Sequence, residues 1–130
     1  MVAANSQCAV ALSLTSGSSG DAPEGRKLLK AISDIPQLKW CEVLMDRAYE
    51  GNETRDLAFT LGFNPVVPPH PNRRLPWQYD EELYKKRNEV ERLFRRLKRF
   101  RRVFTRYDKL DIMYLAFVMM AFIFDYLNLR

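Results

Sequence analysis

DEELYKKRNEVERLFRRLKRFRR, from Asp80 to Arg102, is the stretch on which the expected architecture rests. We predict one long helix over it. Apolar residues recur every seven positions along this helix and just past its end, with one more beside them: Leu83, Val90, Leu97, Phe104 and Phe94. Since residues at this spacing share one face of a helix, the stripe is expected to pack on a sheet.

A second face of the same predicted helix is polar. Steps of three, four and seven residues place four polar side chains along one line, which Arg95 and Arg102 extend: Tyr84, Arg87, Glu91 and Lys98. One carboxylate therefore lies among several cations. The line is either a functional site or a set of intrahelical ion pairs, each worth only about 0.3–0.5 kcal/mol.

Short strands alternate with helices before this stretch, which predicts an α/β layer in a single domain. We expect strands at Cys8–Thr15, Glu42–Asp46 and Asn64–Val67. Helices are expected from Asp21 to about Ile32, from Asn52 to about Leu61 before Gly62, and from about Lys109 to Leu127, with Asp21 and Asn52 as caps.

Positive charge is concentrated in one block of the chain. Residues 73–109 hold fourteen Lys or Arg against six Asp or Glu, although the whole chain has a net charge of +5. Such a block predicts a polyanionic partner, or else a well-solvated helical face. Trp77 and Tyr79, in the loop before the helix, could stack on bases or anchor the loop to the core.

Length and composition indicate an ordinary soluble domain of 130 residues. Cys8 and Cys41 fit no disulfide framework and are expected to be reduced cytosolic thiols. No signal peptide is expected. The uncharged run Ile112–Phe124 is shorter than the roughly 20 residues that span a bilayer, so we expect a buried core helix and no membrane partner.

The polar line resembles a known signature. Tyr84, Arg87, Glu91 and Lys98 reproduce the spacing of the Tyr-Arg-Glu-Lys motif of bacterial DDE-type insertion-sequence transposases. Three other stretches are similar to blocks of that family, closest to its insertion-sequence-five type: Leu44–Tyr49, Pro65–Pro69 with Asn72 and Arg73, and Arg101–Lys109. Gly20–Pro23 is more weakly similar to another block.

The resemblance implies a ribonuclease-H-like catalytic core with an Asp, Asp, Glu triad that binds two Mg2+ or Mn2+ ions. By motif, Asp46 is the second acid and Glu91 the third, and both are expected metal ligands. Roles at DNA phosphates and the reaction centre are implied for Tyr84, Arg87 and Lys98. Further contacts to the DNA backbone are expected from Arg73, Arg74, Arg95 and Arg102, with Arg99 beside them.

The first acid of the triad has no clear counterpart. Asp21 is expected to be a helix cap and Asp34 to follow a helix, whereas the family places this acid on the first strand of its sheet. The sequence is therefore expected to be the C-terminal part of a catalytic domain, an incomplete core that is inactive alone. Its unpaired strands invite re-pairing or association with itself or a complementary fragment.

Three classes of function stay open at this point. The first is DNA strand cleavage and transfer by a cytoplasmic, nucleoid-associated transposase that acts on transposon ends and target DNA. The second is a non-catalytic DNA-binding or regulatory remnant of such an enzyme. The third is an unrelated basic scaffold that binds RNA or anionic surfaces.

Overall fold

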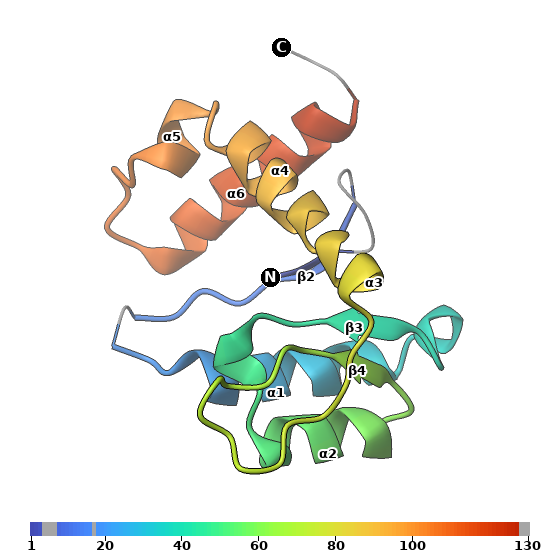
Figure 1. The fold of residues 1–130 in the computed structure, drawn as a ribbon. Helices are drawn as coiled ribbons and strands as arrows, with labels where there is room; N and C mark the ends of the chain where they lie inside the picture. The colour runs from blue at the N-terminus through green and yellow to red at the C-terminus, as the bar shows by residue number, and fades with distance from the viewer. Residues whose placement is uncertain (4–7, 17, 128–130) are drawn as a thin grey trace. The chain divides into compact units, whose positions relative to one another are not determined.

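The computed structural model describes residues 1–3, 8–16 and 18–127, and it groups the chain into two compact units (Figure 1). Unit 1 combines Met1–Leu14 with Asn88–Arg130, and unit 2 is Thr15–Arg87. Sequence reasoning treats the chain as one domain, whereas the two ends of the chain come together in unit 1. Each unit is described by itself.

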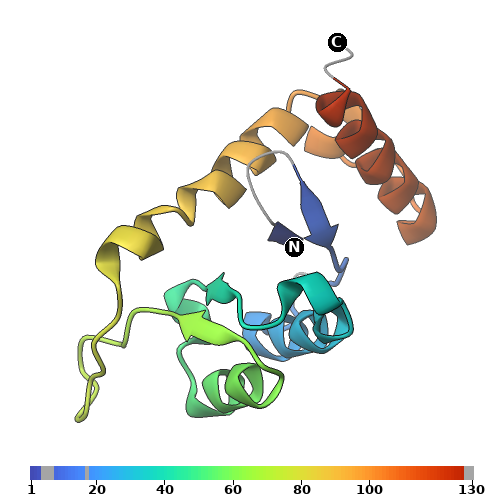
Figure 2. The same cartoon turned by 90° about the vertical axis from the view of Figure 1, so that its right-hand side faces the viewer.

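Unit 2 is built on one pair of parallel strands, β3 (Glu42–Leu44) and β4 (Asn64–Val66). The pairing continues for one residue because Met45 N donates to the Val66 carbonyl oxygen at 3.0 Å. Parallel strands need a crossover, and α2 (Asn52–Thr60) supplies it. In both views α2 and α1 (Asp21–Ser33) lie on the same side of the strands (Figure 1, Figure 2).

The core of unit 2 lies where these helices meet the strands. Its buried side chains come from both helices, from the ends of both strands and from the segments beside them: Leu29, Ile32, Met45, Thr54, Ala58, Phe63, Val66 and Val67. Two short 3-10 helices, η1 (Pro36–Leu38) and η2 (Arg47–Tyr49), link α1 to β3 and β3 to α2. The predicted strands and helices of this unit are therefore confirmed to within about two residues.

The predicted caps of α1 and α2 are wrong. Gly20 and Gly51 occupy the N-cap positions, and neither helix has a side-chain cap. Asp21 and Asn52 are instead the first helical residues. The predicted end of α2 is right, because Gly62 adopts φ +84° and donates from its backbone nitrogen to the Phe59 carbonyl oxygen.

The long helix predicted from Asp80 to Arg102 is wrong as a continuous element. It is divided into α3 (Glu81–Lys85), α4 (Asn88–Leu97) and α5 (Arg101–Phe104). Tight i to i−3 hydrogen bonds mark both interruptions, Arg87 N to the Tyr84 oxygen and Phe100 N to the Leu97 oxygen. Around the second interruption cations lie three or four residues apart, Arg95 with Arg99 and Arg99 with Arg102, and such like charges destabilise a continuous helix.

Unit 1 packs α4 against α6 (Asp111–Tyr126) and a short hairpin of β1 (Val2–Ala3) and β2 (Ala9–Ala11). Its buried centre is Leu93, Leu97 and Ala121. The predicted stripe is therefore right at Leu97 and wrong at Phe104 and Phe94, which are 68% and 43% exposed. The strand expected at Cys8–Thr15 is shorter than predicted, and it pairs antiparallel with β1.

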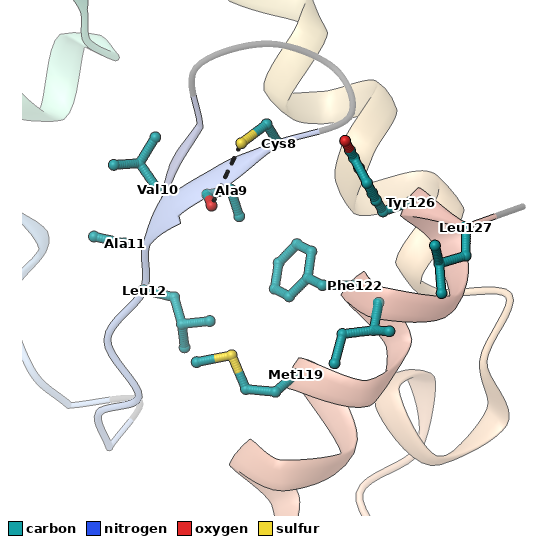
Figure 3. Close-up of a pocket in the computed structure, with 10 residues that line it drawn as sticks. Cys8, Ala9, Val10, Ala11, Leu12, Met119, Phe122, Tyr126 and Leu127 are labelled. Atoms are coloured by element: carbon teal, nitrogen blue, oxygen red, sulfur yellow. Dashed lines mark hydrogen bonds between the residues drawn. The ribbon is translucent and has the colours of Figure 1, made fainter. Parts of the chain in front are cut away.

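The prediction that the last helix is a buried core element is also wrong. Of the α6 residues, all of which are described, Ala121 alone is buried, and Ile112 and Ile123 are 73% and 56% exposed. An apolar pocket opens between α6 and β2, with Leu12, Met119 and Phe122 in its lining (Figure 3). No helix among the described residues is long and apolar enough to cross a membrane.

Replacement of Gly25 by Ala should lower the melting temperature. A Cβ atom at Gly25 would overlap the Tyr49 ring of η2 and lie 2.7 Å from its Cδ1 atom. Overpacking costs about 1–3 kcal/mol, more than the roughly 1 kcal/mol that Ala gains over Gly within a helix. Thermal unfolding followed by circular dichroism measures the change. Gly51→Ala is the control, because nothing lies within 4 Å of its added Cβ; a higher melting temperature for Gly25→Ala would contradict the prediction.

Candidate catalytic and nucleic-acid-binding site

Asp46 lies just past the carboxyl end of β3, the edge at which parallel sheets place their ligand sites. The strand ends at Leu44, two residues before the acid, because Asp46 turns the chain into η2. Its Oδ1 atom accepts a hydrogen bond from Arg47 N at 2.5 Å and so caps that helix. The side chain is 56% exposed, which leaves the carboxylate open to a ligand.

Arg87 and Tyr84 lie beside this carboxylate within unit 2. Arg87 Nη1 is 3.6 Å from Asp46 Oδ2, and its guanidinium lies 5.7 Å from the centroid of the Tyr84 ring. Tyr84 in turn meets Tyr79 edge to face at 5.7 Å. Three residues singled out by sequence are thus connected: the acid, the arginine and the tyrosine.

Glu91 and Lys98 belong to unit 1. Glu91 lies in the first turn of α4, where its half-buried carboxylate is favourably placed in the helix dipole. Lys98 follows the last residue of α4, and its side chain is exposed. The predicted line of four residues on one continuous helix is therefore divided between α3, the turn after it, α4 and the residue beyond α4.

Asp46 fits the donor chemistry of a hard divalent cation. Carboxylate oxygens are the ligands that Mg2+ and Mn2+ prefer, and the 3.6 Å separation from Arg87 leaves Oδ2 loosely held. Among residues 1–3, 8–16 and 18–127, no three His, Cys, Asp or Glu side chains gather into a group able to hold a metal ion. The described residues thus offer metal ligands but not a complete metal cage.

The cations of unit 1 fall into two groups. Some serve the fold: Arg96 Nε donates to both carboxylate oxygens of Asp125 at 3.0 and 2.9 Å and ties α4 to α6. Arg102 lies 3.7 Å from Asp108 and over the Phe117 ring, but its side chain is 56% exposed and stays open to a ligand. Others are exposed, with side chains that make no ion pair to any described residue: Arg95, Lys98 and Arg99.

Arg73 and Arg74 differ sharply although they are neighbours. Arg73 Nη1 contacts Glu50 Oε2 at 2.9 Å, and the same arginine also donates to Asn52. Glu50 accepts from His70 N at 3.3 Å as well, so this acid holds the loop 68–78. Arg74 is exposed, and its side chain has no ionic partner among the described residues.

Sequence reasoning missed two features of unit 2. One is Tyr49, whose pKa is raised by burial first and then by the charges of Asp21 and Asp46. The other is Arg55, which lies 3.5 Å from the centroid of the Trp77 ring. Trp77 donates from Nε1 to the Val67 oxygen at 2.9 Å, so the interpretation that it anchors the loop is confirmed.

Comparisons with known proteins give one family. The family model described as transposase DDE domain matches residues 1–124, which include most of both units. A protein of Brucella ovis described as a putative transposase for insertion sequence element IS6501 is 31% identical over 108 residues, which cover 82% of this chain and 79% of that protein. No solved structure matches the chain.

The neighbourhood of Asp46 can be tested through Tyr49. Because burial and two carboxylates raise the pKa of the phenol, the folded state keeps this proton when the unfolded chain has lost it. Its contribution to stability is therefore full below the ordinary tyrosine pKa of about 10 and is lost as pH rises through the folded value. As pH rises above about 10, the free energy of unfolding of Tyr49→Phe should therefore fall less than that of the wild type.

Absorbance titration of the phenols provides the matching measurement. Asp46→Asn should lower the pKa of Tyr49 toward its ordinary value, because one of the two carboxylate charges is gone. Asp34→Asn serves as a control, since Asp34 caps the far end of α1. Equal titration curves for Asp46→Asn and the wild type would show that Asp46 does not act on Tyr49.

Proposed function

Since this chain belongs to the family of transposase DDE domains, we propose that it acts on DNA in the transposition of an insertion sequence of the insertion-sequence-five type. It contributes the second and third carboxylates of the catalytic triad, Asp46 and Glu91. The short parallel strands and their helices are compatible with an α/β layer, and we assign them to a ribonuclease-H-like core.

The observation that carries the proposal is the contact between Asp46 and Arg87. The two residues are far apart in the sequence and were assigned to separate motifs, yet Nη1 and Oδ2 lie 3.6 Å apart. Tyr84 completes the group through its contact with Arg87. An acid, an arginine and a tyrosine at the carboxyl edge of a parallel sheet form a suitable site for a phosphodiester.

The residues have distinct roles in this proposal. Two bound Mg2+ or Mn2+ ions would activate water and stabilise the leaving oxygen, with Asp46 and Glu91 among their ligands. Arg87 is exposed enough that its pair with Asp46 contributes less than about 1 kcal/mol. It can therefore exchange the carboxylate for a DNA phosphate, and Tyr84 orients its guanidinium plane.

The first acid of the triad is proposed to come from a second polypeptide. Two carboxylates carry too little charge to hold two divalent cations close together against their repulsion. Glu50 does not replace the missing acid, because Arg73 and the His70 amide occupy its Oε2 atom. Catalysis then requires assembly, on DNA in the bacterial cytoplasm and nucleoid.

A non-catalytic role in DNA binding or regulation is the second candidate. The exposed cations Arg95, Lys98 and Arg99 favour it, because they suit phosphate contacts without any catalytic metal. A chain of this kind would compete with an active transposase for transposon ends. The third class, an unrelated basic scaffold, does not agree with membership of the transposase family.

Strand cleavage separates the two candidates. A supercoiled plasmid is incubated with Mg2+ or Mn2+ and the purified chain, alone or with a family polypeptide that carries the first acid. We expect no nicking by the chain alone and nicking by the mixture, which Asp46→Asn and Glu91→Gln each reduce by at least about a hundredfold. Nicking by the chain alone that both variants abolish would disprove the need for assembly. If the mixture does not nick the plasmid, the non-catalytic role in DNA binding or regulation is the function that remains.

DNA binding should depend steeply on salt and little on sequence. Replacement of Arg95, Lys98 and Arg102 together by Gln should weaken binding to all duplexes and reduce the slope of log affinity against log salt by about three. The control is Lys27→Gln, because Lys27 is paired with Glu24 on α1. Equal slopes for the triple variant and the wild type would show that the basic segment is only a solvated face.

A further inference from the structure

Arg55 and Arg73 both direct their guanidinium groups at the Trp77 ring. The Cζ atom of Arg55 lies 3.5 Å from the ring centroid, and that of Arg73 lies 4.6 Å away. Arg55 comes from α2, whereas the other two residues come from the loop after β4. The indole is fixed in place by its hydrogen bond to the Val67 oxygen. A rigid aromatic platform thus presents two cations at one place on unit 2.

The two arginines have unequal partners. Arg73 is satisfied by Glu50 and Asn52. The side chain of Arg55 makes no hydrogen bond or ion pair to any described residue, and its Nε atom is buried without a partner. A buried guanidinium donor without an acceptor is costly, about 1–3 kcal/mol or more for a charged group. The residue as a whole is only partly buried, so an anion can approach the open part of the same guanidinium and supply an acceptor there.

Local charge also favours an anion. Burial and the Arg73 charge lower the pKa of Arg55, while Asp56 and Glu50 act in the opposite direction. Glu50 is already paired with Arg73, and Asp56 is exposed. The cluster therefore keeps uncompensated positive charge at Arg55, with a planar donor edge that suits the oxygens of a phosphate.

We propose that Arg55, held over the Trp77 ring with Arg73 beside the same ring, binds a phosphate group of the nucleic-acid backbone. The inference deepens the proposed action on DNA and rests on it. It adds to the site a residue that lies outside the basic block 73–109 and outside the sequence signature. Trp77 acts as the platform for the arginine and not as a stacking surface for bases.

The first experiment measures binding of a fluorescent duplex of random sequence at several salt concentrations. Arg55→Gln should bind about tenfold more weakly at low salt, and its salt slope should be smaller by about one than that of the wild type. Lys30→Gln is the matched control. It removes the same charge from an exposed position on α1 in the same unit and should keep the wild-type slope.

The second experiment does not require the Gln variant to fold. Trp40 is 82% exposed, so Trp40→Phe leaves Trp77 as the single fluorescent indole. Addition of the duplex to this variant should change the Trp77 emission with the same midpoint as binding. Addition of poly-glutamate at an equal concentration of negative charge should leave the Trp77 emission unchanged. In the same background, Arg55→Lys should reduce the change, because an ammonium group lacks the planar fork.

The outcomes separate this inference from the proposed function. If Arg55→Gln folds and keeps the wild-type slope, or if Trp77 emission is indifferent to duplex, the phosphate site is disproved. If only the triple variant of Arg95, Lys98 and Arg102 weakens binding, DNA binding stands without Arg55. If poly-glutamate changes Trp77 emission as the duplex does, the anion is a protein carboxylate and the nucleic-acid assignment is overturned.

Discussion

The parallel pairing of β3 (Glu42–Leu44) with β4 (Asn64–Val66) is the constraint on which unit 2 depends. Two adjacent parallel strands cannot be joined by a tight turn, so the chain must cross over, and α2 is the crossover. That crossover begins directly after η2, which Asp46 caps. Asp46 therefore lies at the carboxyl edge of the sheet, because the chain leaves β3 there to enter the crossover. The loop after β4 starts at the same edge, and this is why Arg73 and Trp77 can reach Glu50 and Arg55.

Local signals predicted unit 2 well and unit 1 poorly. Gly62 at positive φ follows the end of α2, and short apolar runs mark β3 and β4, so their bounds could be predicted to within about two residues. The second interruption of the helix after Asp80 follows from repulsion among neighbouring cations, which a pattern of apolar residues does not register. The sequence overestimated the burial of α6 for a related reason. Hydropathy shows that a helix favours burial, whereas its actual exposure depends on how many side chains of the rest of the unit can cover it.

The candidate site shows the same division between local and non-local information. Resemblance to family motifs singled out Asp46 and Arg87, and the structure brings them within 3.6 Å. The sequence could not identify Arg55, because this residue stands out only through its contact with Trp77. Trp77 lies in another segment, and no sequence motif links the two positions. Glu50 was equally beyond sequence reasoning. Glu50 lies four residues after Asp46, and the sequence does not show whether it could act as a metal ligand. In the structure, Arg73 donates a hydrogen bond to its Oε2 atom.

Positive charge in this chain is therefore not one uniform surface. Arg73 and Arg96 are bound to carboxylates that hold a loop or a helix pair, so removing either would loosen the fold before it weakened any contact with DNA. The side chains of Arg95 and Lys98 make no ion pair to any described residue. Arg55 lies between these cases, because its guanidinium contacts the Trp77 ring and its Nε atom has no partner among the described residues. For a phosphate ligand such a residue is favourable, because its guanidinium is already held over the Trp77 ring and binding costs little side-chain entropy.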